Sequence, residues 1–459
     1  MSRRFRRSVA AALCLAVAAA SMMGTVASAE EIAAPELENP LKAYDKNSYS
    51  LTLYQKMVSF FPTEKEEEEP QTPQEETPGM SDPGMMAPGV EEPSDAGAAE
   101  ESPSGEAAEE NEEDAVEQVV YPDEYAGAYI DDNDNLHIKL VGKKNAERYE
   151  ALTNNDESVI IEEAATPLSK LHEIQDALDE VMVEFEISET RLQEDTNTVD
   201  VYVTSEEQSI IFKYLNSKIL NFSQKSVKFV DQGSKNSGDF HFTADDSASN
   251  VLAGSELKQG FLGLSLASAG FNAYDKRQQR YGIVTAAHYA EPGNQIKNAK
   301  GTLIGSPTSR QLGDKLDAAF IPFENEATLQ PTAKIKMHTD SSLDDNVTGY
   351  LNNDQLPVGL NTVKIGRTTG YTSGKILTNN QSFTLKGHKF NDQILASNLQ
   401  KDGDSGGPIF HTVIGPVGSG EIRPMELIGI ATVAYRNQAI ASKAQTILDS
   451  FNLRLYRYK

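Results

Sequence analysis

Hydrophobic residues beyond about position 250 fall in short runs of strand length, which Gly, Asn, Asp and Pro interrupt. The runs lie at 261–271, 280–287, 316–323, 361–366, 374–378, 392–399, 406–410 and 426–435. Many short strands with close turns and little helix are typical of a β-sandwich or a pair of β-barrels. Helical periodicity returns only at 441–455, which we expect to form a terminal helix. The pattern therefore predicts an all-β domain over residues 250–459.

Residues 119–240 alternate between strand and helix periods instead. We expect strands at 125–131, 136–142, 157–164, 181–188, 198–204 and 226–232, and helices at 143–154, 167–182 and 205–220. The order is roughly ββαβ twice, so this segment should be an α+β domain. The turn at 131–135 is rich in Asp and Asn, but Leu136 and Gly142 stand where a calcium loop needs a glycine and an acid. A hairpin turn is therefore the favoured interpretation.

Charge separates a third segment, residues 64–118, from the other two. From Glu64 to Glu117 there are 20 acidic residues, one lysine and seven prolines, with few large apolar side chains. Such a composition cannot bury enough apolar surface to fold, so we expect a disordered, solvated linker. The chain has a net charge of −28, yet residues 250–459 carry 22 Lys and Arg against 17 Asp and Glu. The acidity belongs to the N-terminal half and gives no support to a nucleic-acid partner.

Residues 1–29 have the pattern of a secretory signal peptide. Arginines near the start precede the apolar run Val9–Ala20, and an A-x-A sequence offers a cleavage site after Ala29. No later run reaches the roughly 18 apolar residues of a membrane helix, so we expect a secreted, extracellular protein without a membrane span. Residues 30–63 receive no assignment. The only cysteine, Cys14, lies within the signal, so the exported chain offers no disulfide and no thiolate chemistry.

The sequence KDGDSGGPIF surrounds Ser405 with glycines, in a stretch unsuited to packing as a helix or strand. A serine hydroxyl needs a base to take its proton, and the oxyanion that it forms needs backbone N–H donors. Gly403 permits a turn that points its own amide and that of Ser405 into one pocket. His288, after a strand that ends in small residues, is the candidate base. Asp317, at the start of an apolar strand, is the candidate acid that orients it, with Asp314 as the alternative.

The motifs TAAH, LDAAF and GDSGGP, in that order, resemble those of the chymotrypsin-type serine peptidases. The sequence GRTTGYTSG and the terminal helix are similar to the bacterial branch that holds streptogrisin and alpha-lytic protease. The resemblance covers residues 250–459 and implies two antiparallel β-barrels with the site between them, and no cofactor or metal. It implies that His288, Asp317 and Ser405 are catalytic and that the Gly403 and Ser405 amides form the oxyanion hole. The α+β segment resembles the pro-regions of the family, which help the peptidase to fold.

The resemblance also requires a partner for Asp404, because an acid beside the nucleophile must be paired and turned away. Lys364 stands where that cation belongs, with Arg367 close behind; a merely solvated Lys364 is the alternative. The substrate pocket is expected to consist of Leu399, Gln400, Lys401, Asp402, Thr432, Val433 and Ala434. Family members usually carry disulfides near the active serine. This chain has none there, so packing alone must hold the loop before Ser405.

These features predict a secreted serine endopeptidase made as a precursor, acting on proteins or peptides, with its own pro-domain as a partner after cleavage. Self-processing is expected between Gln232 and Gly254, where the chain is polar and rich in Gly, Ser and Asn. The pocket offers no unambiguous buried acid for Lys or Arg, and Ala431 stands where glutamate-selective relatives have a histidine. Cleavage after small or medium apolar residues is therefore expected. Two alternatives remain: a binding protein on an inactive peptidase fold, and an acidic surface module whose peptidase domain serves only self-cleavage.

Overall fold

The computed structural model describes residues 46–65, 117–142, 145–204, 207–230, 250–259, 265–336, 346–412 and 424–458. All of them belong to one compact unit, Tyr44–Lys459. The expected signal peptide, most of the acidic linker and most of the expected processing segment lie outside the described residues. Below, the N-terminal region means residues 46–65 and 117–230, and the C-terminal region means residues 250–458. None of the helices in the described residues is long and apolar enough to cross a membrane.

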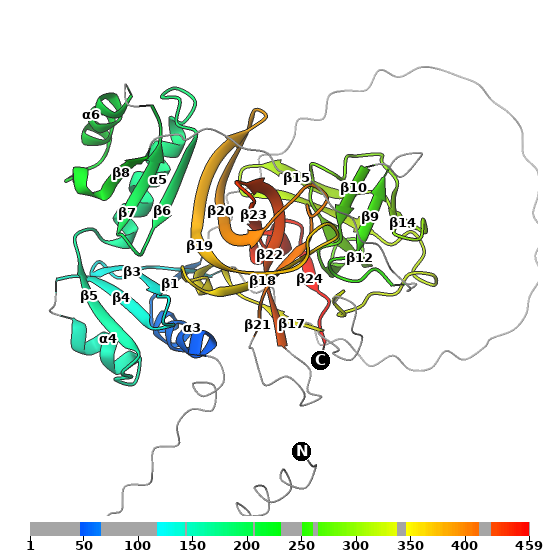
Figure 1. Ribbon diagram of the computed structural model, residues 1–459, viewed down its shortest axis with the longest axis horizontal. Helices are drawn as coiled ribbons and strands as arrows, with labels where there is room; N and C mark the ends of the chain where they lie inside the picture. Colours follow the sequence, from blue (N-terminus) through cyan, green and yellow to red (C-terminus); the bar gives the residue numbers. More distant parts are fainter. Residues whose placement is uncertain are drawn as a thin grey trace, which may run out of the picture. The chain divides into compact units, whose positions relative to one another are not determined.

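The N-terminal region has the mixed α and β character that its periodicity predicts (Figure 1). Its helices are α3 (Lys46–Val58), α4 (Ala146–Leu152), α5 (Leu168–Glu180) and α6 (Gln208–Lys218), with the 3₁₀ turn η2 (Gln224–Ser226). Its strands are β1 (Thr63–Lys65), β2 (Glu117–Val119), β3 (Tyr125–Ile130), β4 (Leu136–Val141), β5 (Val159–Ala164), β6 (Glu189–Gln193), β7 (Thr198–Tyr202) and β8 (Val227–Val230). Strands β3, β4 and β5 form one sheet, and β6, β7 and β8 belong to another. The two ββαβ repeats are therefore present.

Two details of this region differ from the sequence expectation. Residues 181–186 form turns rather than a strand, and β6 begins only at Glu189. The alternating apolar residues there do not share a buried face: Val183 is 81% exposed, whereas Ile187, which a strand would place on the same face, is buried. The turn between β3 and β4 is the expected hairpin turn, because Asp131 Oδ1 accepts hydrogen bonds from the backbone amides of Asn133 and Asn135. Its carboxylate is thus used to close the turn.

The two ends of the acidic segment lie next to each other. Strands β1 and β2 pair antiparallel, with Thr63 opposite Val119 and Lys65 opposite Glu117. Helix α3, which precedes the acidic segment in the sequence, contacts β3, β4 and α4, which follow it. The acidic segment is therefore an insertion into the N-terminal region, and that region begins at α3, within the residues that the sequence analysis left unassigned.

The C-terminal region is built almost wholly from strands, as expected. The strands are β9 (Glu256–Gln259), β10 (Ser265–Ser268), β11 (Asn272–Asp275), β12 (Arg280–Thr285), β13 (Ile296–Asn298), β14 (Leu303–Gly305), β15 (Ser309–Gly313), β16 (Leu316–Pro322), β17 (Asn346–Tyr350), β18 (Asn361–Gly366), β19 (Gly370–Leu385), β20 (His388–Leu399), β21 (Pro408–Thr412), β22 (Pro424–Tyr435), β23 (Gln438–Lys443) and β24 (Leu453–Leu455). The 3₁₀ turn η3 (Asn353–Gln355) and helix α7 (Ala444–Ser450) complete it. The terminal helix is shorter than predicted, because residues 453–455 form β24, which pairs with β11.

The strands form two barrel-like halves. In the first half, a four-stranded sheet (β10-β9-β13-β14) and a five-stranded sheet (β15-β16-β12-β11-β24) enclose one apolar core, which includes Leu257 and Ile296 from one sheet and Ile283 and Ile321 from the other. In the second half, the order β18-β21-β22-β23-β20-β19 closes on itself through the pairing of β18 with β19. The fold-class expectation is confirmed, with the second barrel closed and the first divided into two sheets.

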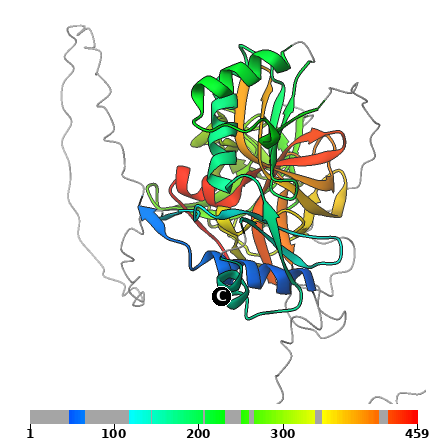
Figure 2. The ribbon, with the colours of Figure 1, turned by 90° about the vertical axis from the view of Figure 1, so that its left-hand side faces the viewer.

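The long strand β19 joins the two regions. Strand β6 of the N-terminal region pairs antiparallel with β19, with Arg191 opposite Gln381 and Glu189 opposite Phe383. The sheet of the second barrel therefore continues through β6, β7 and β8. Helix α5 packs against β6 and β7 of this extended sheet (Figure 2). Because backbone hydrogen bonds continue the sheet, β19 is an interior strand where it meets β6.

Candidate active site

His288 and Asp317 come from the first barrel-like half and contact each other directly. His288 lies just after β12, and Asp317 is the second residue of the neighbouring strand β16. Asp317 Oδ2 lies 2.6 Å from His288 Nδ1, and Asp317 Oδ1 accepts the backbone N–H of His288 at 2.9 Å. Asp317 is 1% exposed, whereas the His288 side chain is 40% exposed. A carboxylate at Nδ1 favours the tautomer protonated there, which leaves Nε2 able to accept a proton.

Strands of the second barrel fix the position of Asp317. The Asp317 amide donates to Ser442 Oγ on β23 at 2.9 Å, and that hydroxyl donates to Gln393 Oε1 on β20 at 3.0 Å. Asp314, the alternative acid, lies in the turn between β15 and β16 with φ +54°, and its backbone N–H donates to the carbonyl of Lys389 on β20. Only Asp317 of these two acids is hydrogen-bonded to His288 among the described residues.

Ser405 comes from the second barrel, in the segment between β20 and β21. Its hydroxyl donates a hydrogen bond to the carbonyl oxygen of Thr432 on β22 at 3.0 Å. Among the described residues, no hydrogen bond joins Ser405 to His288. The side chains of Ser405, His288 and Asp317 nevertheless line the same cavity, of about 290 Å³. The fold thus places three residues from distant parts of the sequence around one space.

The glycines beside Ser405 occupy positions that other residues would not fit. Gly403 has φ +92°, and a Cβ there would lie 2.5 Å from Thr368 Oγ1. Gly406 has φ +87°, and a Cβ there would lie 2.2 Å from Thr285 Oγ1. Within the described part of the chain, neither the Gly403 amide nor the Ser405 amide donates a hydrogen bond to another group. Both N–H groups are therefore available to an oxygen of a bound molecule.

Asp404 and Lys364 form an ion pair that is shielded from solvent. Lys364 Nζ lies 2.9 Å from Asp404 Oδ2, and both side chains are 0% exposed. Burial lowers the pKa of Lys364, and the Asp404 carboxylate opposes that shift. The same carboxylate accepts hydrogen bonds from the amides of Thr368 at 2.8 Å and Thr369 at 3.0 Å. Arg367, the other nearby cation, instead pairs with Glu256 at 2.7 Å.

The cavity differs in part from the pocket expected from the sequence. Six expected residues line it: Gln400, Lys401, Asp402, Thr432, Val433 and Ala434. Leu399 does not. Since side chains alternate along a strand, Leu399 at the end of β20 points outward between buried Asn398 and Gln400, and it is 41% exposed.

Five further residues that were not expected from the sequence also line the cavity. They are Leu312, Leu385, Lys386, His388 and Phe390. Four of them belong to the hairpin of β19 and β20, whose turn has Lys386 and Gly387 at positive φ. That Lys-Gly turn between apolar strands was the one available signal for the hairpin. Its place beside the cavity depends on tertiary packing.

Buried titratable groups line the contact between the N-terminal region and β19. Glu194 accepts hydrogen bonds from the Ala128 amide at 2.8 Å and Asn379 Nδ2 at 3.1 Å. Burial raises the pKa of Glu194 to about 7. His172 on α5 lies 3.4 Å from Asn380 Nδ2, and burial lowers its pKa to about 4. The neutral forms of both side chains are therefore favoured where the two regions meet.

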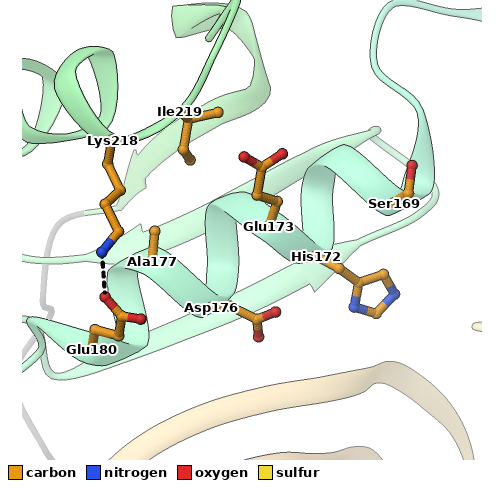
Figure 3. A pocket seen from close by; sticks show the side chains of 8 residues that line it. All are labelled: Ser169, His172, Glu173, Asp176, Ala177, Glu180, Lys218 and Ile219. Carbon is orange, nitrogen blue, oxygen red and sulfur yellow. Dashed lines mark hydrogen bonds and ion pairs between the residues drawn. The ribbon is translucent and has the colours of Figure 1, made fainter.

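A second cavity, of about 350 Å³, lies along α5 (Figure 3). The view shows His172 and Asp176 pointing to one side of the helix and Glu173 to the other. At one end, Lys218 Nζ and Glu180 Oε2 form an ion pair at 3.0 Å. No group of three or more His, Cys, Asp and Glu side chains within the described ranges is arranged to hold a metal ion.

A family model described as a Pro-like N-terminal domain matches residues 92–164. The match starts within the acidic segment and ends with β5, so it covers a minor part of the chain. It agrees with the expectation of a pro-region upstream of the all-β region. A comparison with curated proteins gave no match.

Solved structures of bacterial serine proteases also match. A chymotrypsin of Cellulomonas bogoriensis is 22% identical with a TM-score of 0.36, and the match covers 46% of this chain and 100% of that one. A Nocardiopsis protease, NAPase, is 23% identical with a TM-score of 0.36, covering 45% and 98%. A glutamic acid specific serine protease, said to use a novel histidine triad in substrate binding, is 20% identical with a TM-score of 0.38, covering 45% and 100%.

Each of these structures is a protein to which this chain is similar. At such identities and TM-scores they transfer neither an activity nor a specificity to this chain.

Proposed function

We propose that this chain is the precursor of a secreted serine endopeptidase, in which Ser405 is the nucleophile, His288 the general base and Asp317 the acid that orients it. The observation that carries the proposal is the shared cavity. It brings a histidine held by a buried carboxylate at 2.6 Å together with a serine between two positive-φ glycines. Carboxylate, imidazole and hydroxyl in this order are the parts that acyl transfer to a serine requires.

The reaction follows from this geometry. His288 Nε2 takes the proton of the Ser405 hydroxyl as the oxygen attacks the substrate carbonyl, and the proton then passes to the leaving amine. Water hydrolyses the resulting acyl-enzyme by the same route. The negative charge on the carbonyl oxygen is stabilised by the Gly403 and Ser405 amides, which have no acceptor elsewhere in the described residues. The Ser405 hydroxyl, which donates to the Thr432 carbonyl, must first give up that hydrogen bond for one to His288.

The ion pair of Lys364 and Asp404 supports this mechanism by removing a charge from the site. An ionised Asp404 facing the cavity would repel the oxyanion. Its carboxylate is instead buried, where it accepts hydrogen bonds from Lys364 and from the backbone amides of Thr368, Thr369 and Lys401. The buried cation therefore has a structural role in the proposed enzyme.

The N-terminal region is proposed to act as the pro-domain. Its backbone pairing with β19 gives it a specific contact with the second barrel. Cleavage by the enzyme itself is expected between Gln232 and Gly254, and the cleaved pro-domain would remain a partner. Protein or peptide chains are the substrates. Leu312, Phe390 and Val433 give the cavity an apolar lining, which favours small or medium apolar residues at the cleaved bond.

The proposal is tested by expressing the full chain with Ser405→Ala or His288→Ala and measuring hydrolysis of a fluorogenic peptide library. Each variant should lose at least about 10³-fold in kcat/KM, since members of a catalytic triad act as a unit. Processing between Gln232 and Gly254 should stop in both. Unchanged hydrolysis by purified Ser405→Ala protein would refute the mechanism, and unchanged processing would assign the cleavage to another protease.

A further inference from the structure

The orientation of one peptide bond decides whether Gly403 can serve the oxyanion. Residues Lys401 to Asp404 form a β-turn, because the Asp404 amide donates to the Lys401 carbonyl at 3.0 Å. Gly403 is the third residue of this turn, and its φ of +92° is typical of type II. In a type I turn the third residue has φ near −90°, and the peptide between the second and third residues is rotated by about half a turn. The Asp402–Gly403 peptide therefore has two accessible orientations, which differ in the direction of the Gly403 N–H.

Thr368 bonds the carbonyl of this same peptide. Its hydroxyl donates to the Asp402 carbonyl oxygen at 2.8 Å. In a trans peptide the C=O and the N–H point in opposite directions, so a donor that holds the carbonyl turns the Gly403 N–H away from itself. That N–H makes no hydrogen bond within the described residues, which is what an amide facing the cavity requires.

Thr368 is itself fixed to the most buried charge of the site. Its backbone amide donates to Asp404 Oδ1 at 2.8 Å, and the other oxygen of that carboxylate binds Lys364 Nζ at 2.9 Å. Neither Asp404 nor Lys364 is exposed to solvent. The backbone of Thr368 is therefore held by a buried ion pair, which fixes the position of its hydroxyl.

A second hydroxyl holds the next peptide. Ser268 Oγ donates to the Gly403 carbonyl at 2.9 Å and accepts the amide of Arg367 at 2.9 Å. The carbonyls of Asp402 and Gly403 thus each accept a hydrogen bond from a side-chain hydroxyl. The sequence has a single cysteine, Cys14, so no disulfide within the chain is available to brace this loop. The hydrogen bonds from Thr368 and Ser268 supply a restraint of a different kind.

We propose that Thr368 is a positioning residue for the oxyanion-binding amide: its hydroxyl holds the Asp402 carbonyl so that the Gly403 N–H faces the carbonyl oxygen of the substrate. This role rests on the proposed serine peptidase function. Thr368 touches neither substrate nor reacting atoms and acts through the orientation of one peptide. Loss of its hydroxyl should leave the fold and substrate binding intact and weaken stabilisation of the transition state.

The test compares the wild-type chain with Thr368→Val, Thr368→Ser and Thr372→Val, each expressed as the full chain and allowed to mature. Valine keeps the branched shape of threonine and removes only the hydroxyl, whereas serine restores it. Thr372 lies four residues further on, on strand β19, and its hydroxyl makes a 3.5 Å contact with the Lys364 carbonyl; it is the matched control. The readouts are kcat, KM, inhibition by a peptide aldehyde, and thermal unfolding.

Thr368→Val should lower kcat about three- to tenfold with KM within twofold, because one neutral hydrogen bond is lost. Affinity for the aldehyde, whose adduct carries the oxyanion, should fall by the same factor. Thr368→Ser should stay within twofold of wild type in kcat and in affinity for the aldehyde. Thr372→Val should match wild type in both quantities.

Full kcat in a folded Thr368→Val protein would overturn the proposal. So would equal losses in the valine and serine variants, or failure of Thr368→Val to fold, because the role assigned is local to one peptide. If the wild-type chain shows no Ser405-dependent hydrolysis, it is the proposed function that fails. That outcome is separate from any difference among the Thr368 variants.

Discussion

Lys364 and Asp404 lie 2.9 Å apart with neither side chain exposed to solvent. Removing one partner of a buried pair leaves an uncompensated charge, which typically costs about 3–5 kcal/mol. We therefore expect Lys364→Met to lower the free energy of unfolding by about that amount, measured by denaturant titration in the Ser405→Ala background to avoid self-digestion.

Lys375→Met is the matched control for this variant. Lys375 lies 3.5 Å from the fully exposed Asp132, and such pairs contribute less than about 1 kcal/mol. Similar losses in the two variants would contradict the assignment of Lys364 as a buried structural cation.

Asp317 rather than Asp314 should be essential for turnover. Asn at 317 cannot accept the Nδ1 proton of His288 in the same way and would favour the wrong tautomer, a change that costs about 10⁴-fold in comparable triads. Asp317→Asn should thus reduce kcat by several orders of magnitude, and Asp314→Asn should retain most of it. Steady-state kinetics on the two purified variants decides the matter. A larger loss of kcat with Asp314→Asn would assign the orientation of His288 to Asp314 instead.

The methyl group of Ala434 should limit the size of the side chain at the cleaved bond. A peptide-library profile of the wild-type enzyme is expected to favour Ala, Val, Leu and Met. Ala434→Gly should shift that profile toward larger residues by roughly tenfold or more, since one methylene in a pocket is worth about 1–3 kcal/mol. Ala327→Gly, on an exposed loop outside the cavity lining, should leave the profile unchanged. A profile dominated by Arg, Lys or Glu would refute the pocket assignment and leave the triad untouched.

Glu194 should make the precursor less stable as pH rises. Its pKa is raised from 4.5 to about 7 by burial, so the folded state binds the proton more tightly than the unfolded chain. The stability that the folded state gains from this protonation is fully present below pH 4.5, declines as pH rises and is lost above pH 7. A shift of this size corresponds to about 3 kcal/mol. The change in the free energy of unfolding caused by Glu194→Gln, relative to the parent, should therefore be more stabilising at pH 8 than at pH 5.

Thermal unfolding of Ser405→Ala precursors at the two pH values measures this difference. Glu150→Gln, an exposed change on α4, provides the control. Burial of His172 acts in the opposite direction, because its pKa is lowered to about 4 and its contribution is lost as pH falls below 6.5. Each variant is compared with its parent at the same pH, so the contribution of His172, which is common to both, cancels. A pH-independent effect of Glu194→Gln would contradict the prediction.

Local patterns predicted many of the helices and strands, and they selected His288, Asp317 and Ser405, which the fold places around one cavity. The period-2 and period-3.6 runs identified β3 to β5, α5 and α6. Helix α5 is the clearest case, because it buries Leu171, Ile174 and Leu178 at helical spacing. They failed at residues 181–188, where an alternating pattern belongs to turns with Val183 exposed. They also failed at the C-terminus, where β24 exists only because β11 offers it an unpaired edge.

Contacts between distant segments could not be predicted in this way. The paired ends of the acidic insertion depend on β1 meeting β2, and the wall of the cavity depends on where the β19–β20 hairpin packs. The restraint on the loop before Ser405 was expected to be packing alone. The structure adds hydrogen bonds from Thr368 and Ser268, which lie far from Ser405 in the sequence. Thr368 belongs to the GRTTGYTSG motif, but that motif does not by itself indicate a contact with the Asp402 carbonyl.

Covalent labelling is the most direct test of whether Ser405 is the nucleophile. The matured wild-type protein is treated with a peptidyl phosphonate that carries an apolar residue at the reactive position, and the labelled residue is located by peptide mass mapping. We expect one adduct per molecule, on Ser405. It should be absent from Ser405→Ala and strongly reduced in His288→Ala, because the base that activates the hydroxyl is missing. An adduct on another serine, or no adduct in an enzyme that still hydrolyses peptides, would contradict this expectation.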